Sequence, residues 1–319
     1  MRPPAFWNDA GAPQGRLLAP AAWLYARIAR PRQGGARRAP VPVVCIGNAV
    51  LGGAGKTPVA LAVAERLAAA GHRPHFLSRG YGGQQRGPVR VDPAAHGAGD
   101  VGDEPLLLAR VAPAWVARNR PAGALAAADA GASIVVMDDG FQNSSLAKDV
   151  ALLVADGAVG YGNGRVFPAG PLREPAEAAH ARADALVVIG TPRCALPNGL
   201  PRLEARLMPA PGSERLAGEP VFGFAGIGRP AKFAETLQEL GARLVDFRAF
   251  PDHHVYRPEE AMTLLEQAAA LGARCVTTEK DAVRLPPDIR DAVETVPVNI
   301  EWRDPGGLDR LLQEKGLIG

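Results

Sequence analysis

The stretch Val41-Pro42-Val43-Val44-Cys45-Ile46, followed by Gly52-Gly53-Ala54-Gly55-Lys56-Thr57-Pro58, decides the fold class. An apolar run, a glycine-rich loop and a helical pattern predict a strand, a turn and a helix. Glycines let the backbone wrap around an anion with its N–H groups pointing inward. The helix N-terminus adds partial positive charge, Lys56 can reach the β- and γ-phosphates, and the Thr57 hydroxyl can bind Mg²⁺. We therefore predict a nucleotide-phosphate site at Gly52, Gly53, Ala54, Gly55, Lys56, Thr57 and Pro58.

The loop departs from the usual pattern G-x-x-x-x-G-K-[ST] at one position. Its first glycine would fall at residue 50, where this chain has Val50. The additional glycines at 47, 52 and 53 can supply the same flexibility in a different loop shape. The alternative is a glycine-rich strand-to-helix turn that binds nothing. The Gly-Lys-Thr context favours an enzyme that handles ATP or GTP.

Apolar strands near 133–137, 151–154 and 185–189 alternate with alanine-rich helices, which favours a parallel sheet covered on both faces. After a proline-rich stretch the alternation restarts and runs to a helix near the C-terminus. We therefore predict an α/β fold, with a P-loop NTPase-like parallel sheet domain, a second, smaller α/β domain and a cleft between them. The predicted boundaries are 1–38 for a basic amphipathic helix region, 39–210 for the P-loop domain and 211–319 for the smaller domain.

Composition excludes several classes of protein. Over 319 residues, 47% are hydrophobic and 22% charged, as is ordinary for a globular protein in water. The net charge of +3 is too small to imply nucleic-acid binding, so no nucleic-acid partner is expected. The three cysteines lie far apart and lack the spacing of a metal site.

The charge distribution near the N-terminus is uneven. No acidic residue occurs between Asp9 and Glu65, and Leu17, Leu24 and Ile28 recur at near-helical spacing. The arginines in this window are Arg16, Arg27, Arg30, Arg32, Arg37 and Arg38. A basic amphipathic helix of this kind can lie in a membrane interface against anionic head groups. The alternative is a helix packed on the protein's own core. The apolar stretch is too short and too interrupted to span a bilayer.

Two acidic residues end a predicted strand. Val135-Val136-Met137-Asp138-Asp139 has the form of a Walker B segment, whose carboxylates can hold Mg²⁺ directly or through water. The alternative is an Asp-Gly turn that ends the strand. The glycine-rich loop earlier in the chain favours the metal role for Asp138 and Asp139.

A second pair of acids, Asp103 and Glu104, lies in a glycine-flanked loop before a predicted helix. Either residue could simply cap that helix. The functional interpretation is that one of them orients and deprotonates an acceptor hydroxyl. Phosphoryl transfer has a loose transition state, so positioning and charge neutralisation matter more than a strong base.

Asp252-His253-His254 forms another candidate group. Adjacent histidines usually comprise one exposed and one packed residue, but an Asp–His pair across the cleft would tune a base near neutral pH. Residues 278–281, Thr-Glu-Lys-Asp, can place polar groups at the cleft. They are not a GTPase base-recognition loop of the form Asn-Lys-x-Asp, because the lysine comes one position too late.

Taken together, the motifs resemble the lipid A 4′-kinase family, the tetraacyldisaccharide 4′-kinases of Gram-negative bacteria. They are Gly-Asn (47–48), Gly-Gly-Ala-Gly-Lys-Thr-Pro (52–58), Ser-Arg-Gly-Tyr-Gly-Gly (78–83), Gly-Asp-Glu-Pro (102–105), Asp-Asp-Gly-Phe-Gln (138–142), Pro-Ala-Gly-Pro-Leu-Arg-Glu-Pro (168–175), Asp-His-His (252–254) and Thr-Glu-Lys-Asp (278–281). The resemblance covers nearly the whole chain. It implies Mg²⁺-dependent transfer of the ATP γ-phosphate to the 4′-hydroxyl of a tetraacylated glucosamine disaccharide 1-phosphate, giving lipid IVA. It also implies a peripheral protein on the cytoplasmic face of the inner membrane, with the N-terminal helix in contact with anionic lipid.

The resemblance assigns roles to individual residues. Lys56 and the backbone of 52–57 would hold the phosphates, and Asp103 would be the base, paired with His253 in preference to His254. The implied Mg²⁺ ligands are Thr57, Asp138, Asp139 and Glu104. The implied substrate contacts are Arg79, Arg173 and His254.

Two positions depart from the family pattern. Asn143 stands where many members have histidine, so position 143 is given no catalytic role. Val50 stands where many carry a hydroxyl, so any side-chain contact there is absent, although backbone N–H groups suffice for the loop.

The main competing hypothesis is a membrane-associated switch ATPase with a deviant Walker A loop, Lys-Gly-Gly-x-Gly-Lys-Thr. That class needs a second lysine where this chain has Leu51, which favours a transferase. A nucleotide-binding regulator without turnover would leave Asp103 and the histidine pair without a role.

Overall fold

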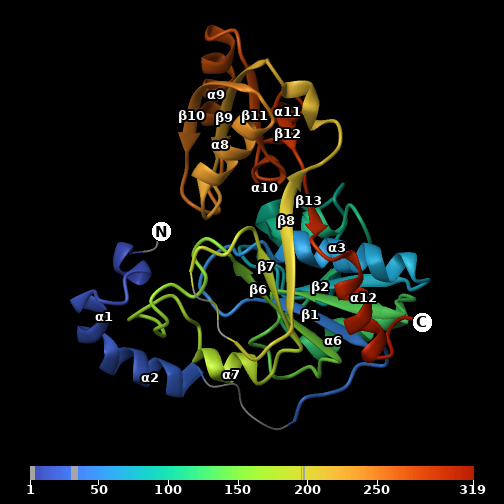
Figure 1. The fold of residues 1–319 in the computed structure, drawn as a ribbon. Coiled ribbons are helices and arrows are strands. Elements are labelled where there is room, and N and C mark those ends of the chain that lie inside the picture. The colour runs from blue at the N-terminus through green and yellow to red at the C-terminus, as the bar shows by residue number, and fades with distance from the viewer. Residues whose placement is uncertain (1–3, 30–34, 195, 197) are drawn as a thin grey trace.

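The computed structural model describes residues 4–29, 35–194, 196 and 198–319. Its strands form two sheets, which define a larger and a smaller body, one above the other in Figure 1. The strands of the larger sheet are β1 (Val43–Gly47), β2 (Pro74–Ser78), β3 (Val89–Arg90), β4 (Ala114–Val116), β5 (Ile134–Asp138), β6 (Val150–Asp156), β7 (Ala185–Ile189), β8 (Arg202–Pro209) and β13 (Val298–Trp302). Those of the smaller sheet are β9 (Pro220–Ala225), β10 (Arg243–Ala249), β11 (Arg274–Thr278) and β12 (Glu294–Val296).

The larger sheet has nine strands in the order β13-β8-β7-β6-β1-β5-β2-β4-β3. All neighbouring pairs from β8 to β4 are parallel, and only the two edge pairs are antiparallel. The helices of this body are α3 (Lys56–Ala69), α4 (Ala98–Val101), α5 (Asp103–Leu108), α6 (Arg120–Asp129), α7 (Ala176–His180) and α12 (Pro305–Glu314). The predicted P-loop NTPase-like parallel sheet is therefore confirmed.

Both faces of this sheet are buried, as a parallel sheet requires. Alternate residues of β1 enter different cores, because successive side chains of a strand point to opposite faces. Val44 and Ile46 pack with α3 and α12, whereas Val43 and Cys45 pack with α6 and α7. In Figure 1 these two pairs of helices lie on opposite sides of the sheet.

The central strand β1 lies between β5 and β6, and the three are parallel. Their carboxyl ends therefore meet at one edge of the sheet, where ligands of open α/β sheets bind. β1 ends at Gly47, β5 at Asp138 and β6 at Asp156. A β-carbon on Gly47 would collide with Phe141, which explains why only glycine fits at this strand end.

The smaller sheet has four parallel strands in the order β10-β9-β11-β12. Its helices are α8 (Pro230–Glu239), α9 (Pro258–Ala270), α10 (Glu279–Ala282) and α11 (Pro287–Arg290), with a short 3₁₀ helix η2 (Ser213–Leu216). The alternating residues of β9 again enter two cores: Phe222 and Phe224 pack with α9, and Val221 and Ala225 pack with α8. The second, smaller α/β unit is therefore present.

The C-terminal segment returns to the larger body, whereas the sequence groups all of residues 211–319 in the smaller one. β13 pairs antiparallel with β8, from Val298 opposite Pro209 to Trp302 opposite Ala205. On α12, Leu308 and Leu312 are buried in the core that contains α3. The physical reason is that β13 covers the otherwise unpaired edge of β8. In Figure 1 the long β8 and the red β13 run side by side towards the smaller body.

The N-terminal region forms η1 (Ala5–Asn8), α1 (Pro13–Leu17) and α2 (Ala19–Ala29), beside the larger sheet in Figure 1. Arg30 and Arg32 of the predicted basic helix lie outside the described residues. The ring of Tyr25 on α2 packs edge-on against Phe167, with 5.2 Å between centroids. No helix in the described ranges has the length and apolar character needed to cross a bilayer.

Candidate active site

The glycine-rich loop connects β1 to α3 and is shaped by two glycines in the left-handed region. Gly52 has φ +113° and Gly55, which precedes the first turn of α3, has φ +81°. A β-carbon on Gly52 or Gly53 would meet no atom within 4 Å, so this side of the loop faces open space. The Asn48 amide donates to the Gly52 carbonyl at 3.0 Å and ties the loop across its base. The loop thus exposes backbone and a helix N-terminus, an arrangement suited to binding an anion.

Residues of the motif at 168–175 hold this loop from outside. The Leu51 N–H donates to the Pro171 carbonyl at 2.8 Å, and Nε of Arg173 donates to the Val50 carbonyl at 3.1 Å. The Gln142 amide donates to the Asn48 carbonyl at 3.0 Å. The loop shape is therefore fixed by groups from distant parts of the chain, including the carbonyl of Val50, the position that departs from the usual pattern.

The strand-end acids lie against the start of α3. The Thr57 hydroxyl donates to Oδ2 of Asp138 at 2.9 Å, and Nζ of Lys56 lies 3.7 Å from Oδ1 of Asp139. Arg173 reaches the same carboxylate, with Nη2 3.7 Å from Oδ2. Asp139 has φ +51°, an uncommon conformation outside glycine. Two cations, two carboxylates and a hydroxyl are thus gathered at the start of α3.

These acids fit a divalent cation. Within the described part of the chain, Oδ1 of Asp138 and Oδ1 of Asp139 are buried and accept no hydrogen bond. Burial and, next, the charge of Asp139 raise the pKa of Asp138 to about 6. Two adjacent carboxylates, each with one oxygen that accepts no hydrogen bond, are a donor set that Mg²⁺ prefers.

The second acidic pair lies where the two bodies meet. Asp103 is the first residue of α5 and is buried. Its Oδ2 lies 3.1 Å from Nδ1 of His253 and accepts from Nε of Arg284 at 2.8 Å, and Nη2 of Arg284 contacts the same oxygen. Nζ of Lys280 lies 3.9 Å from it. All three partners come from the smaller body, so tertiary structure alone builds this group.

The surroundings keep Asp103 charged. Burial raises the pKa of Asp103, but the hydrogen bond with His253 opposes this. A hydrogen bond with Glu104 and the charges of Lys280 and Arg284 act in the same direction as His253, and together they hold the pKa of Asp103 well below its usual range. Asp103 is therefore a carboxylate at neutral pH, suited to accept a hydrogen bond from a hydroxyl.

Glu104 is paired with Lys280, whose Nζ lies 2.6 Å from Oε1. Burial, the largest cause, raises the pKa of Glu104 to about 7. Ligand atoms of Asp103, Glu104 and His253 lie within 4.8 Å of one another, close enough for a metal. Lys280 and Arg284 already neutralise these carboxylates, however, so the contacts of Glu104 favour an ion pair over a metal ligand.

The two histidines have different surroundings. His253 adopts φ +59°, its backbone N–H donates to the Gly226 carbonyl at 3.1 Å, and its ring lies 5.4 Å from that of Tyr81. Nε2 of His254 lies 2.7 Å from the Glu260 carboxylate, and its ring stacks on Phe250 at 4.7 Å. Only His253 faces Asp103. His254 is instead held within the smaller body.

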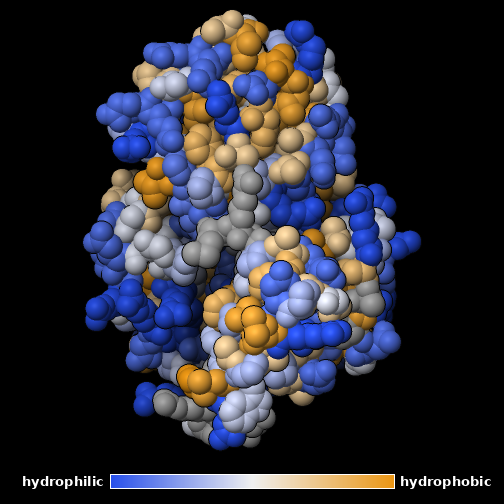
Figure 2. Space-filling view, turned by 90° about the vertical axis from the view of Figure 1, so that its left-hand side faces the viewer, coloured by the Kyte–Doolittle hydropathy of each residue, from blue (hydrophilic) through white to orange (hydrophobic). Residues whose placement is uncertain are grey.

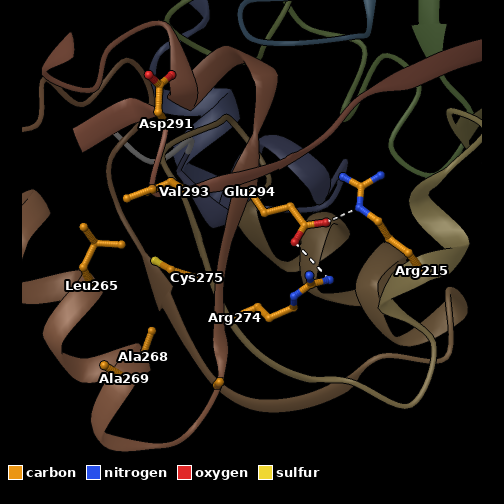
Figure 3. A pocket seen from close by; sticks show the side chains of 11 residues that line it. Arg215, Leu265, Ala268, Ala269, Arg274, Cys275, Asp291, Val293 and Glu294 are labelled. Atoms are coloured by element: carbon orange, nitrogen blue, oxygen red, sulfur yellow. Dashed lines mark hydrogen bonds and ion pairs between the residues drawn. The ribbon is translucent and has the colours of Figure 1, made fainter. Parts of the chain in front are cut away.

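The remaining predicted residues are more scattered. Arg79 is exposed after β2 and makes no hydrogen bond or ion pair with the described residues. Asn143 accepts from the N–H groups of Ser145 and Leu146 and so shapes a turn. A surface pocket on the smaller body, in which Glu294 pairs with Arg215 and Arg274, contains none of the predicted residues (Figure 3).

Sequence reasoning missed Arg284, Gly226, Gln142 and Glu174. Arg284 lies four residues after Lys280, one helical turn on, and that spacing was an available signal. Gln142 and Glu174 belong to quoted motifs, and Glu174 pairs with Arg182 beside Gln142. Nothing in the sequence indicates that Gly226 is the carbonyl shared by His253 and Arg284.

Comparison with known proteins gives consistent results. The family model described as tetraacyldisaccharide-1-P 4′-kinase (LpxK) matches residues 14–316. Tetraacyldisaccharide 4′-kinase of Rhodospirillum centenum is 54% identical over 98% of this chain and 96% of its own. The tetraacyldisaccharide 4′-kinase of Gluconacetobacter diazotrophicus is 54% identical over 98% of this chain and 97% of its own.

A solved structure agrees with the sequence relatives. The crystal structure of LpxK from Aquifex aeolicus in complex with ATP superposes with a TM-score of 0.76 at 27% identity, covering 94% of this chain and 99% of that one. Because the match covers 94% of this chain, it extends over both bodies. By sequence and by fold, the chain belongs to the tetraacyldisaccharide-1-phosphate 4′-kinase (LpxK) family.

Proposed function

We propose that this protein transfers the γ-phosphoryl group of ATP to the 4′-hydroxyl of a tetraacyldisaccharide 1-phosphate, the step that gives lipid IVA. The observation that carries the proposal is the meeting of a phosphate-binding loop with a carboxylate–imidazole pair. A β-carbon on Gly228 would lie 3.6 Å from the Gly53 nitrogen and 3.7 Å from the Asp252 carboxylate. The loop that carries His253 is therefore next to the loop proposed to hold ATP.

In the donor half, the backbone of residues 52–57 and the ammonium of Lys56 hold the β- and γ-phosphates. Thr57, Asp138 and Asp139 would hold Mg²⁺, which neutralises charge on the phosphate oxygens when bound. Arg173, which contacts Asp139, adds a second cation on the same side. These groups favour the transition state, in which charge spreads over the transferred phosphoryl oxygens.

In the acceptor half, Asp103 accepts the hydrogen bond of the 4′-hydroxyl. The hydroxyl oxygen attacks the γ-phosphorus, a new O–P bond forms, and the bond from phosphorus to the β,γ-bridging oxygen breaks. ADP departs, and the hydroxyl proton passes to the Asp103–His253 pair. Because Asp103 is a weak base, its main contribution is to orient the hydroxyl, as a loose transition state allows.

The N-terminal region supports a peripheral contact with anionic membrane at the cytoplasmic face of the inner membrane. Of its apolar side chains, Leu17 is 81%, Trp23 64%, Leu24 55% and Ile28 77% exposed. Ala22 is buried and Tyr25 is half-buried, so one face of α2 packs on the protein. The other face carries the exposed apolar side chains. Figure 2 views the molecule from this side and shows hydrophobic patches set among hydrophilic surface. An acylated substrate requires such an approach to a lipid surface.

The test is transfer of radiolabelled γ-phosphate from ATP to a tetraacylated disaccharide 1-phosphate in mixed micelles. We expect a labelled lipid that depends on both enzyme and Mg²⁺, and loss of transfer when EDTA removes the metal. ATP hydrolysis without lipid labelling would contradict the proposal and support the switch ATPase with the deviant Walker A loop.

A further inference from the structure

Arg284 connects the two bodies through a single planar group. Its guanidinium contacts Oδ2 of Asp103 through Nε at 2.8 Å and through Nη2. On the other side, Nη1 donates to the Gly226 carbonyl at 2.8 Å and to Oδ1 of Asp281 at 3.1 Å. Arg284 is only 7% exposed, and its rigid fork allows little freedom once these bonds form.

The Gly226 carbonyl also determines the position of His253. It accepts from Nη1 of Arg284 and from the backbone N–H of His253. His253 has φ +59°, a conformation that persists in a non-glycine residue only when its surroundings enforce it. One carbonyl therefore positions both the arginine and the histidine that contact Asp103.

A buried carboxylate fixes Arg284 from behind. Asp281 is fully buried, and besides Arg284 it accepts from the Gly226 N–H at 2.8 Å, the Tyr256 hydroxyl at 2.8 Å and the Thr278 hydroxyl at 2.6 Å. A buried ion pair contributes little net stability when compared with apolar packing. The bonds that Asp281 accepts instead hold the Arg284 guanidinium in one orientation.

We propose that Arg284 is a positioning residue for phosphoryl transfer, which holds Oδ2 of Asp103 and the loop of His253 in one arrangement across the two bodies. His253, Lys280 and Arg284 all contact Oδ2 of Asp103 and Glu104 is a further neighbour of this carboxylate, so we assign Oδ1 to the acceptor hydroxyl. The inference rests on the proposed kinase function. Arg284 contacts no residue of the phosphate-binding loop, so its role separates from ATP binding.

The test compares steady-state kinetics of Arg284→Gln and Arg284→Lys with those of the wild type. We expect Arg284→Gln to lower kcat about 100-fold, because small misplacements of a reacting group cost this much, with KM for ATP changed less than about threefold. Arg284→Lys keeps the positive charge but loses the forked geometry of the guanidinium, and its kcat should be about tenfold higher than that of Arg284→Gln. The matched control is Arg229→Gln, which removes another inter-body ion pair, to Asp156 at 2.6 Å, without contacting Asp103.

The outcomes separate the inference from the function on which it rests. Wild-type protein that labels no lipid overturns the proposed function. Active wild type with an Arg284→Gln variant that keeps its kcat, or that loses kcat no more than Arg229→Gln does, overturns only the role of Arg284. If Arg284→Gln does not fold, Tyr256→Phe removes one bond to Asp281 and keeps every charge. It should lower kcat about three- to tenfold at unchanged KM, and an unchanged kcat overturns the role.

Discussion

The donor and acceptor halves of the site are built in different ways. The donor half comes from one sheet edge: the loop after β1, the start of α3 and the acids that end β5. The acceptor half combines Asp103 of the larger body with His253, Lys280 and Arg284 of the smaller one. The donor half is therefore built within one body, whereas the acceptor half exists only when the two bodies are in contact.

In the backbone, each half contains one non-glycine residue with a positive φ, Asp139 at +51° in the donor half and His253 at +59° in the acceptor half, and the halves differ in which body supplies the supporting contacts. The phosphate-binding loop reaches its shape through glycines at 52 and 55, for which a positive φ costs little. In the acceptor half, His253 has a positive φ and is held by the Gly226 carbonyl. A strained non-glycine residue needs supporting contacts, and here the smaller body supplies them. Mutations should therefore affect the two halves differently.

The largest effect is expected for Lys56→Ala in the donor half. Loss of the ammonium removes contacts to the phosphates in the ground state and in the transition state. We expect kcat/KM for ATP to fall about 10⁴-fold, with weaker ATP binding. Isothermal titration with a non-hydrolysable ATP analogue, together with lipid-labelling kinetics, measures both parts. Unchanged affinity for the analogue would contradict a phosphate contact for Lys56.

Asp103→Asn probes the acceptor half. The amide keeps the size of the side chain but loses the charge that orients the hydroxyl and accepts its proton. We expect kcat to fall about 10²- to 10⁴-fold with affinity for ATP largely kept. The same titration and kinetics apply. Equal loss of ATP binding in Asp103→Asn and Lys56→Ala would remove the distinction between the two halves.

Gly47→Ala tests whether the donor half depends on packing at the end of β1. The added β-carbon would collide with Phe141 and approach its backbone nitrogen to 3.1 Å. We expect a loss of about 1–3 kcal/mol in the free energy of unfolding, as for other overpacked sites. The matched control is Gly53→Ala, where the β-carbon meets nothing within 4 Å. Chemical denaturation should show a change below about 1 kcal/mol there, and equal losses would refute the packing argument.

The smallest effect is expected in the N-terminal region, which belongs to neither half. The double variant Leu24→Ser/Ile28→Ser removes exposed apolar side chains and should weaken binding to phosphatidylglycerol vesicles about tenfold. Transfer to substrate dispersed in detergent should stay the same. Leu271→Ser, at a 49% exposed leucine on the smaller body, serves as control. Equal vesicle binding by the double variant and the wild type would contradict a membrane contact through Leu24 and Ile28, and would favour a helix that only packs on the protein.

Much of the fold was predictable because apolar strand patterns and glycine-rich turns are local. The alternation after Thr57 indicated a parallel sheet, and the acids at 138 and 139 followed the strand expected to carry them. The strand from Val298 to Trp302 was not predictable. Its sequence alone does not indicate which sheet it joins. It pairs with the edge strand β8 of the larger sheet, a contact that only the tertiary structure shows. The assignment of residues 211–319 to a single smaller unit fails at that point.

By itself, the sequence determined the α/β class, the glycine-rich loop between a strand and a helix, the strand-end carboxylates and the order of motifs that identifies the family. These features depend on residues that are close together in the chain. Tertiary structure alone decided which histidine meets Asp103, that Lys280 neutralises Glu104, and that Arg284 joins the two bodies at one carboxylate oxygen. Such contacts bring together residues up to 181 positions apart. No local pattern records them, because they depend on how two separately packed cores fit against each other.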